Sequence, residues 1–167
     1  MTNILFVALI SRDAKPLYMQ MFDERTQNMS SSATAPLEGE NQDNGVPKEN
    51  PGLFLKYNFL AHMALDVFAS PMALLSRETA VDGVALLFVQ DSVSVYGMES
   101  NNGLKIVVGM DNECENNTLR DLFGRIFRCY IRTVCNPFSE VLGVRDCENM
   151  LQTERFDARI KEAIRLM

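Results

Sequence analysis

The sequence predicts an α+β fold whose elements follow one another in the order β-β-α-β-β-β-α-α. Three observations lead to this prediction. Two apolar runs near the N-terminus are separated by a short polar stretch, which is typical of a β-hairpin. Residues 52–69 space their apolar side chains as a helix does. Residues 82–138 read as three short strands joined by turns and followed by a long amphipathic helix.

The first hairpin is expected between residues 3–10 and residues 17–22. The first run is almost entirely apolar, as a strand buried on both faces would be. Residues 11–15 are polar and turn-like, and Pro16 opens the second run, in which alternate apolar side chains share one face. At 167 residues the chain is long enough to bury a core, and we expect a single domain.

Residues 24–51 differ in composition from the rest of the chain. They are rich in Ser, Asn, Gln, Glu, Gly and Pro and contain almost no large apolar residue. Such a segment buries too little apolar surface to offset the entropy that ordering would cost. We expect a long mobile loop inserted into the domain, either with a function of its own or as a tolerated insertion.

The predicted helix at residues 52–69 has apolar side chains on two sides. One side is a stripe suited to packing on a sheet, formed by Leu53, Tyr57, Leu60, Ala61, Ala64 and Phe68. The other side has a second apolar row beside a polar row: Leu55, Phe59 and Met63 next to Asn58, His62 and Asp66. A helix that is apolar on two sides is either buried on both or covered by a partner. We expect the second apolar row to be exposed in the isolated chain and to be covered in a complex.

Three further strands are predicted at residues 84–89, 93–98 and 104–110. Asp91 and Ser92 indicate a turn between the first two. The Asn102-Gly103 dipeptide predicts a tight hairpin between the last two, because both residues tolerate a positive φ. The third run is nearly continuously apolar, as in a strand that is covered on both faces.

The long helix is predicted to begin near Thr118, because Thr118 with Asp121 three residues later resembles a capping box. Pro137 would end it, since the residue before a proline avoids the helical region. A last short helix is expected at residues 156–167. The apolar face of the long helix consists of Leu119, Leu122, Phe123, Ile126, Phe127, Tyr130 and Val134.

Composition and charge restrict the possible functions. The net charge of −6 argues against a general nucleic-acid binder, because phosphate contacts need a concentrated basic surface. No apolar run reaches the roughly 18 residues of a membrane span, and the N-terminal run lacks the basic start of a signal peptide. The four cysteines show no CxxC spacing, and reduced thiols in a cytosolic protein are a simpler interpretation than a disulfide framework.

Few residues offer catalytic chemistry. His62 is the only histidine, and the neighbouring Asn58 and Asp66 are poor substitutes for the His or Cys ligands of a metal site. Cys135 would be a nucleophile only if His62 lay beside it in space, and a buried structural cysteine at a helix end is the more common arrangement. The sequence has no P-loop, GxGxxG or GxSxG motif. We therefore expect no catalytic residue, no cofactor and no metal.

Arg125, Arg128 and Arg132 align on the outer face of the predicted long helix. They form either a solvated face or a docking patch for an acidic partner or for anionic lipid headgroups. The sequence leaves both interpretations open.

Several short motifs together resemble one protein family. Residues 130–138, Tyr-Ile-Arg-Thr-Val-Cys-Asn-Pro-Phe, are similar to a segment near the C-terminus of the sedlin-related small subunits of TRAPP, the transport protein particle tethering complex. Asn-Pro-Phe is the most specific part. Residues 64–67 resemble the family's Ser-Leu-Asp-Ile/Val segment, with Ala64 in place of the serine. The family's strand pattern and the start of its last helix are matched by residues 95–97, 104–108 and 156–157.

The resemblance covers most of the chain outside residues 24–51, and the residues from Lys105 to Gly109 together with Cys135 are more similar to the sedlin-like paralogue branch than to sedlin. It implies a longin-like (SNARE-like) fold, in which a five-stranded antiparallel sheet carries the first helix on one face and the last two helices on the other. It also implies a non-enzymatic subunit or adaptor of the TRAPP vesicle-tethering complex, acting in ER-to-Golgi and intra-Golgi transport.

The partners that the resemblance implies are other TRAPP subunits. A Rab GTPase would be reached indirectly, because other subunits carry the exchange activity. The implied location is the cytoplasm, peripheral to Golgi and ER–Golgi membranes, with membrane contact only through the complex and no nucleic acid. Two alternatives are another longin-type trafficking adaptor or regulatory domain, and a small-molecule sensor that holds a ligand in the sheet cavity.

Asp66 matches the aspartate of the family's Leu-Asp motif. It lies near the C-terminal end of the predicted helix, where the helix dipole makes an aspartate slightly unfavourable. The resemblance therefore implies that Asp66 contacts a basic or hydrogen-bond-donating group on another subunit, whereas a solvated surface charge is the alternative. With Leu55, Phe59, Met63 and His62, it makes up the expected partner-binding surface.

Overall fold

The computed structural model describes residues 3–22, 51–70, 83–112, 114–136 and 150–165. Five strands form one antiparallel sheet in the spatial order β2-β1-β5-β4-β3. The strands are β1 (Ile4–Ile10), β2 (Pro16–Met21), β3 (Val84–Gln90), β4 (Val93–Glu99) and β5 (Lys105–Met110). The helices whose full bounds lie within the described residues are α1 (Pro51–Ala69), α3 (Asn116–Val134) and α5 (Glu154–Arg165). The predicted order of strands and helices is confirmed.

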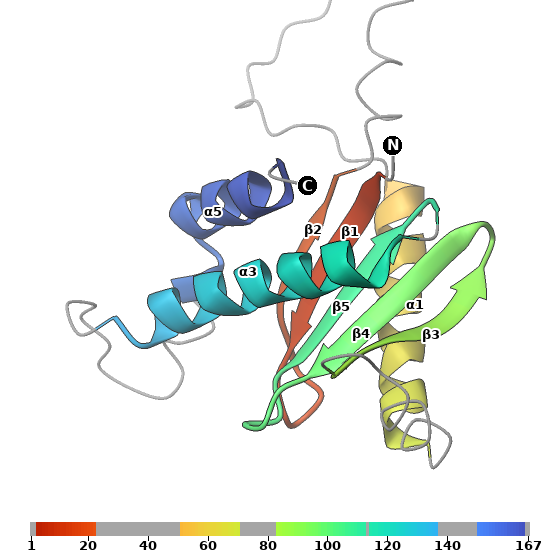
Figure 1. Ribbon diagram of the computed structural model, residues 1–167, viewed down its shortest axis with the longest axis horizontal. Coiled ribbons are helices and arrows are strands. Elements are labelled where there is room, and N and C mark those ends of the chain that lie inside the picture. The colour runs from red at the N-terminus through yellow and green to blue at the C-terminus, as the bar shows by residue number, and fades with distance from the viewer. Residues whose placement is uncertain (1–2, 23–50, 71–82, 113, 137–149, 166–167) are drawn as a thin grey trace, which may run out of the picture.

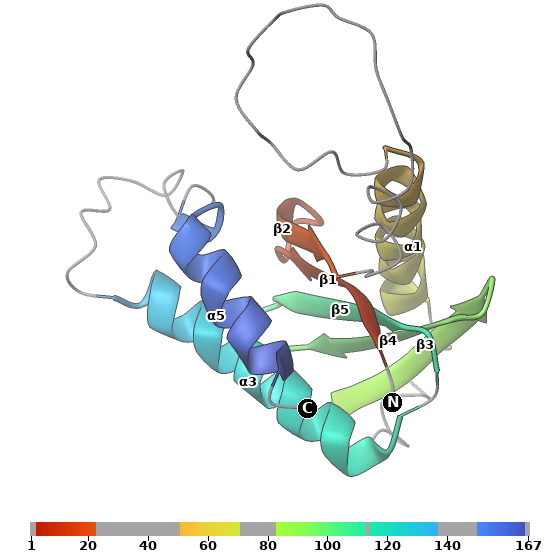
Figure 2. The same ribbon diagram turned by 90° about the horizontal axis from the view of Figure 1, so that it is seen from above.

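The sheet separates two helical layers. Helix α1 covers one face, and α3 and α5 lie side by side over the other (Figure 1, Figure 2). The buried side chains divide accordingly into one cluster under α1 and a second cluster under α3 and α5. This is the longin-like arrangement that the family resemblance implies. Of the loop predicted at residues 24–51, all but Pro51 lies outside the described residues, and Pro51 is the first residue of α1.

Strand β1 is buried along its whole length because helices cover both of its faces. Its side chains alternate between the two clusters, except that Leu5 and Phe6 both belong to the cluster under α1. The pairing of β1 with β5 shifts register between Ile4 and Phe6, as it does at a β-bulge. The extra residue turns Phe6 toward α1.

Strand β3 forms one edge of the sheet and pairs only with β4. Its register with β4 shifts between Leu86 and Phe88, so that Leu87 and Phe88 both pack toward α1. Leu86 and Val89 on this strand are 44% and 55% exposed. The edge strand is therefore bulged and carries apolar side chains at the surface.

The tight turn of the central meander is at Asp91-Ser92. Both residues have a positive φ, 51° and 64°, and the flanking residues Gln90 and Val93 pair directly. Positive φ at both central residues of a two-residue loop is the feature of a type I′ turn. The turn predicted at Asp91-Ser92 is confirmed. It has the two consecutive positive φ values that were expected at Asn102-Gly103.

The hairpin predicted at Asn102-Gly103 is confirmed, because β4 and β5 pair directly on either side of it, but it is not a two-residue turn. The loop is longer, because the Ser100 N–H donates to the Leu104 carbonyl at 2.8 Å, and of the two residues only Gly103 has a positive φ, 85°. The side chain of Asn102 stabilises this longer loop, since its Oδ1 accepts a hydrogen bond from the Leu104 N–H at 3.2 Å. This local bond gives the backbone an alternative to the two-residue turn.

Both helices of the second layer begin two residues earlier than predicted. The N-cap of α3 is Glu115, without a side-chain cap bond, and its carbonyl accepts the Leu119 N–H at 3.1 Å. Thr118 is thus already inside the helix, and the predicted capping box is wrong. Helix α5 begins after Thr153, whose Oγ1 accepts the Phe156 N–H at 3.4 Å as an N-cap side chain does.

Candidate protein-binding surface

Helix α1 rests on the sheet through the inner stripe that its periodicity predicts. Tyr57, Leu60, Ala61 and Ala64 are buried, and the Tyr57 ring stacks on the Phe6 ring with centroids 5.2 Å apart. These contacts fix the helix along its length. Its opposite side consequently faces away from the protein.

An ion pair links α1 to the sheet. Lys56 Nζ lies 3.3 Å from Asp91 Oδ2 in the tight turn between β3 and β4. Both side chains are partly exposed, so the pair contributes little to stability. The pair is compatible with the rotation of α1 that its buried inner stripe sets.

The outward side of α1 carries two large exposed apolar residues. Leu55 is 71% exposed and Phe59 is 56% exposed, which confirms the expected exposure of these two side chains in the isolated chain. Met63 is only half-exposed and packs against the core under α1, so the expectation for Met63 is wrong. Each step of four residues rotates the row by about 40° around the helix, and two steps carry Met63 toward the inner stripe.

The helical rotation that moves Met63 inward places His62 and Asp66 in line with Leu55. His62 is seven residues after Leu55, which places it about 20° to one side of Leu55 around the helix axis. Asp66 is eleven residues after Leu55, about 20° to the other side, so both side chains point in nearly the same outward direction as Leu55. His62 and Asp66 are exposed. We call the four side chains of Leu55, Phe59, His62 and Asp66 the outer stripe of α1: it is apolar in its N-terminal half and polar in its C-terminal half.

The apolar half of this surface is wider than the sequence predicted. Phe54, which periodicity does not place in either row, is 39% exposed beside Leu55. Of the five large apolar side chains that are exposed in the described part of the chain, three belong to α1. Exposed apolar side chains gathered on one element indicate a site of protein–protein contact.

The polar half of the outer stripe lies at the C-terminal end of α1, where no basic side chain in the last turn offsets the negative end of the helix dipole. Asp66 is exposed one turn before the end of α1. His62 and Asn58 line a small hollow against the β1–β2 hairpin, with a volume of about 20 Å³. That space is close to one water molecule, which is too small for an organic ligand.

The structure separates the two residues that were considered for nucleophilic chemistry. His62 lies on α1 and Cys135 follows α3, on the opposite face of the sheet (Figure 2). Cys135 is exposed at the C-cap, where its N–H donates to the Ile131 carbonyl at 2.8 Å. The expectation that Cys135 is a buried packing residue is therefore wrong.

Metal ligands do not gather in the part of the chain that the structure describes, since no three His, Cys, Asp or Glu side chains there could hold an ion together. Among the same residues, no helix has the length and apolar composition to cross a bilayer. The chemistry that the outer stripe of α1 offers is thus apolar contact with a partner at one end and charge or hydrogen bonding at the other.

Comparisons with known proteins identify related chains. The family model described as sedlin matches residues 9–165. The TRAPP-associated protein TCA17 of Saccharomyces cerevisiae is 29% identical over 139 residues, which cover 79% of this chain and 77% of that protein. The trafficking protein particle complex subunit 2-like protein of Bos taurus is 28% identical over 100 residues, covering 56% of this chain and 69% of that protein. The protein of the same description from Taeniopygia guttata is 29% identical over 100 residues.

Proposed function

Because the chain belongs to the sedlin family, we propose that it is a non-catalytic adaptor subunit of the TRAPP tethering complex that docks on another subunit through the outer stripe of α1. The names of the relatives support the complex. The exposure of Leu55 and Phe59 supports the surface, and it is the observation on which the proposal depends.

The apolar half of the stripe would supply most of the binding energy. Full burial of a large apolar side chain is worth roughly 1.5–3 kcal/mol, so two such residues form a plausible anchor for an interface. Asp66 would add specificity, because a basic or N–H-donating group on the partner would find its carboxylate at one fixed end of the apolar contact. Phe54 widens the apolar area on one side.

Within the complex the chain would act through its contacts. It would support assembly of a Rab guanine-nucleotide exchange complex whose activity other subunits carry, in ER-to-Golgi and intra-Golgi transport. Its place would be the cytoplasm, at Golgi and ER–Golgi membranes through the complex alone. Another longin-type adaptor would use the same surface with a different set of partners, and the experiment below separates the two.

The test is affinity purification of the full chain from cells, followed by quantitative mass spectrometry. The variant Leu55→Ala/Phe59→Ala removes the apolar half of the stripe. The matched control Leu86→Ala/Val89→Ala removes two exposed apolar side chains from β3. We expect TRAPP subunits with the wild type and the control, and a loss of roughly tenfold or more with the α1 variant, which corresponds to about 1.4 kcal/mol.

Each part of the proposal can fail separately. A wild-type chain that recovers no TRAPP subunit, or only subunits of another adaptor complex, contradicts the assignment to TRAPP. Equal recovery by the α1 variant and the wild type contradicts the docking surface but leaves the complex in place. Circular dichroism of each variant checks that the fold is retained.

A further inference from the structure

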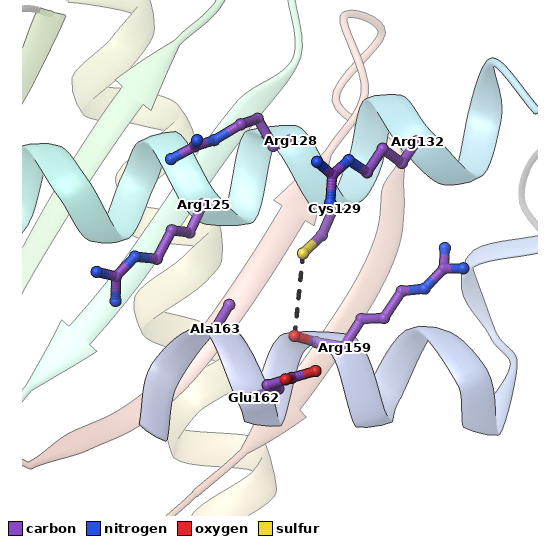
Figure 3. A pocket seen from close by; sticks show the side chains of 7 residues that line it. All are labelled: Arg125, Arg128, Cys129, Arg132, Arg159, Glu162 and Ala163. Carbon is purple, nitrogen blue, oxygen red and sulfur yellow. Dashed lines mark hydrogen bonds between the residues drawn. The ribbon is translucent and has the colours of Figure 1, made fainter. Parts of the chain in front are cut away.

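A groove runs between α3 and α5, on the side of the sheet opposite the outer stripe of α1. Its volume is about 440 Å³. Figure 3 shows arginine side chains extending from both α3 and α5, and Cys129 directed from α3 toward α5. The lining residues are Arg125, Arg128, Cys129, Arg132, Arg159, Glu162 and Ala163.

The two helices that form the groove differ in charge from the rest of the chain. Helix α3 contains four arginines and one acidic residue, and α5 contains four basic and three acidic residues. Their combined formal charge is +4, in a chain whose net charge is −6. Positive charge is therefore concentrated on this layer, and the groove collects half of its basic side chains.

Two of the arginines that line the groove donate hydrogen bonds to neutral groups. Arg128 Nε donates to the Gly124 carbonyl at 3.1 Å, and Arg159 Nη1 donates to Thr133 Oγ1 at 3.2 Å. Across the described residues, no carboxylate forms an ion pair with Arg128, Arg132 or Arg159. Their positive charge is thus available to an external carboxylate, which guanidinium groups bind in a bidentate manner.

The floor between the arginines is neutral and close-packed. Ala163 is buried, and Cys129 is half-buried with its Sγ directed at the Arg159 carbonyl, 3.9 Å away. Burial raises the pKa of the Cys129 thiol, although Arg159, Arg132 and Arg128 act in the opposite direction. The thiol is therefore protonated at neutral pH, and the floor offers apolar contact rather than a second anion.

We propose that this groove binds an acidic protein segment, whose carboxylates pair with Arg128, Arg132 and Arg159 and whose small apolar side chains rest on Cys129 and Ala163. The groove is opposite the proposed TRAPP-docking stripe, so the inference does not depend on that function. If both hold, the chain binds two partners at once, one on each side of its sheet.

The arrangement of charges favours a peptide over a phosphorylated headgroup. The α3 arginines from 125 to 132 are spread over about 10 Å of helix, which suits carboxylates spaced along a chain better than one compact polyanion. Glu162 lines the same groove. A carboxylate there repels clustered phosphates, but it can accept a backbone N–H or a lysine of a peptide.

The experiment is fluorescence anisotropy with the full chain and a fluorescein-labelled peptide of roughly twelve residues that carries glutamates and alanines on one helical face. A second peptide has glutamine at every glutamate. The test variant is Arg128→Glu/Arg132→Glu. The control, Arg155→Glu/Lys161→Glu, makes the same change in net charge on exposed residues of α5 that do not line the groove.

We expect saturable binding of the glutamate peptide that weakens with salt, falls roughly tenfold or more in the groove variant and changes less than about twofold in the control. Backbone amide shifts on titration should change in α3 and α5 and not in α1. Absence of saturable binding, equal binding of the glutamine peptide, or equal losses in both variants would overturn the proposal. Binding to phosphatidylserine vesicles without binding to the peptide would overturn it in favour of a membrane surface.

Discussion

The ring of Tyr18 in β2 meets the ring of Phe156 in α5 edge-on, with centroids 4.8 Å apart and planes at 89°. Phe156 is fully buried at the start of α5, and Tyr18 is buried on the second strand of the sheet. Edge-to-face pairs of this kind add about 0.5–1.5 kcal/mol beyond the area they bury. The contact joins the last helix to the N-terminal hairpin.

The first prediction is that Tyr18 makes the protein sensitive to alkali. Burial, and then the neighbouring carboxylate of Asp157, raise the pKa of Tyr18 well above its ordinary value. The folded state thus favours the neutral phenol, so the associated stability is complete below about pH 10, the pKa of an unfolded tyrosine, and declines as the pH rises above it. Melting temperature measured from about pH 8 to pH 11 should fall most at the upper end.

The variant Tyr18→Phe provides the check on that assignment. It loses the hydrogen bond to Gln20, at a cost of about 1 kcal/mol near neutral pH, but it should show a smaller alkaline decline. An equally steep decline in Tyr18→Phe would show that other groups cause it.

The second prediction concerns Gly109, which is paired with Phe6 across β5 and β1. A Cβ at this position would lie 2.1 Å from Phe6 Cε1, and the Phe6 ring cannot move away freely because it stacks on Tyr57. Gly109→Ala should therefore destabilise the fold by about 1–3 kcal/mol in chemical denaturation. Gly124→Ala, in α3 with no atom nearer than 3.9 Å, should stabilise it by up to about 1 kcal/mol.

The third prediction concerns Asp66. Asp66→Ala should leave the fold intact and raise its stability by about 0.3–1 kcal/mol, because it removes a negative charge from the C-terminal end of α1. If Asp66 pairs with a buried group on a TRAPP subunit, the same variant should bind that subunit more weakly by about 1–3 kcal/mol. Asp66→Tyr should bind more weakly still, since it adds a steric clash. Unchanged binding of both folded variants in calorimetry would show that Asp66 is only a solvated charge.

The fourth prediction distinguishes Cys129 in α3 from Cys135, the C-cap residue that follows it. Cys135 is exposed, whereas Cys129 is half-buried and burial raises the pKa of its thiol. Iodoacetamide at neutral pH should therefore modify Cys135 much faster than Cys129, because the thiolate is the reactive form. Peptide mapping by mass spectrometry measures the two rates in one sample. Faster labelling of Cys129 would contradict the buried floor of the groove.

The strands were predictable because their signal is strong and local. Val107 and Val108 in β5 are both fully buried, one under each helical layer, which is why the run is continuously apolar. The boundaries of the five strands differ from the prediction by at most one residue. The conformations of the turns were harder to predict than the hairpins themselves. At Asn102-Gly103 the preference of the pair for positive φ competes with the hydrogen bond that the Asn102 side chain accepts from the Leu104 N–H.

The errors at helix ends have a related cause. A threonine such as Thr118 can cap a helix. In the structure the Leu119 N–H donates to the Glu115 carbonyl, so Thr118 already lies within the first helical turn. The sequence pattern does not distinguish these two possible starts of the helix. The exposure of Cys135 is explained by its angular position relative to the buried face of α3. Cys135 lies nine residues after the buried Ile126, about 180° around the helix, so its exposure follows from the spacing.

The docking stripe was predictable in part for the same reason. Leu55 and Phe59 lie outside the inner face by periodicity alone, and the structure exposes them. Met63 lies eight residues after Leu55, and this spacing rotates its side chain by about 80° around the helix axis, toward the core under α1. The groove was not predictable, because it depends on α5 placing Arg159 beside the arginines of α3, and no periodicity within one helix contains that pairing.

The bulge in β3 also bears on whether a second chain could pair with this edge of the sheet. An edge strand that exposes Leu86 and Val89 is a template on which a second chain can add, and such addition starts aggregation. At Leu87 the pairing with β4 slips by one residue, which bends the strand and breaks the regular spacing of its backbone groups. An incoming strand would find only short segments to pair with on either side of that residue. A bulge on an edge strand disfavours the continuous pairing that fibril-like growth requires.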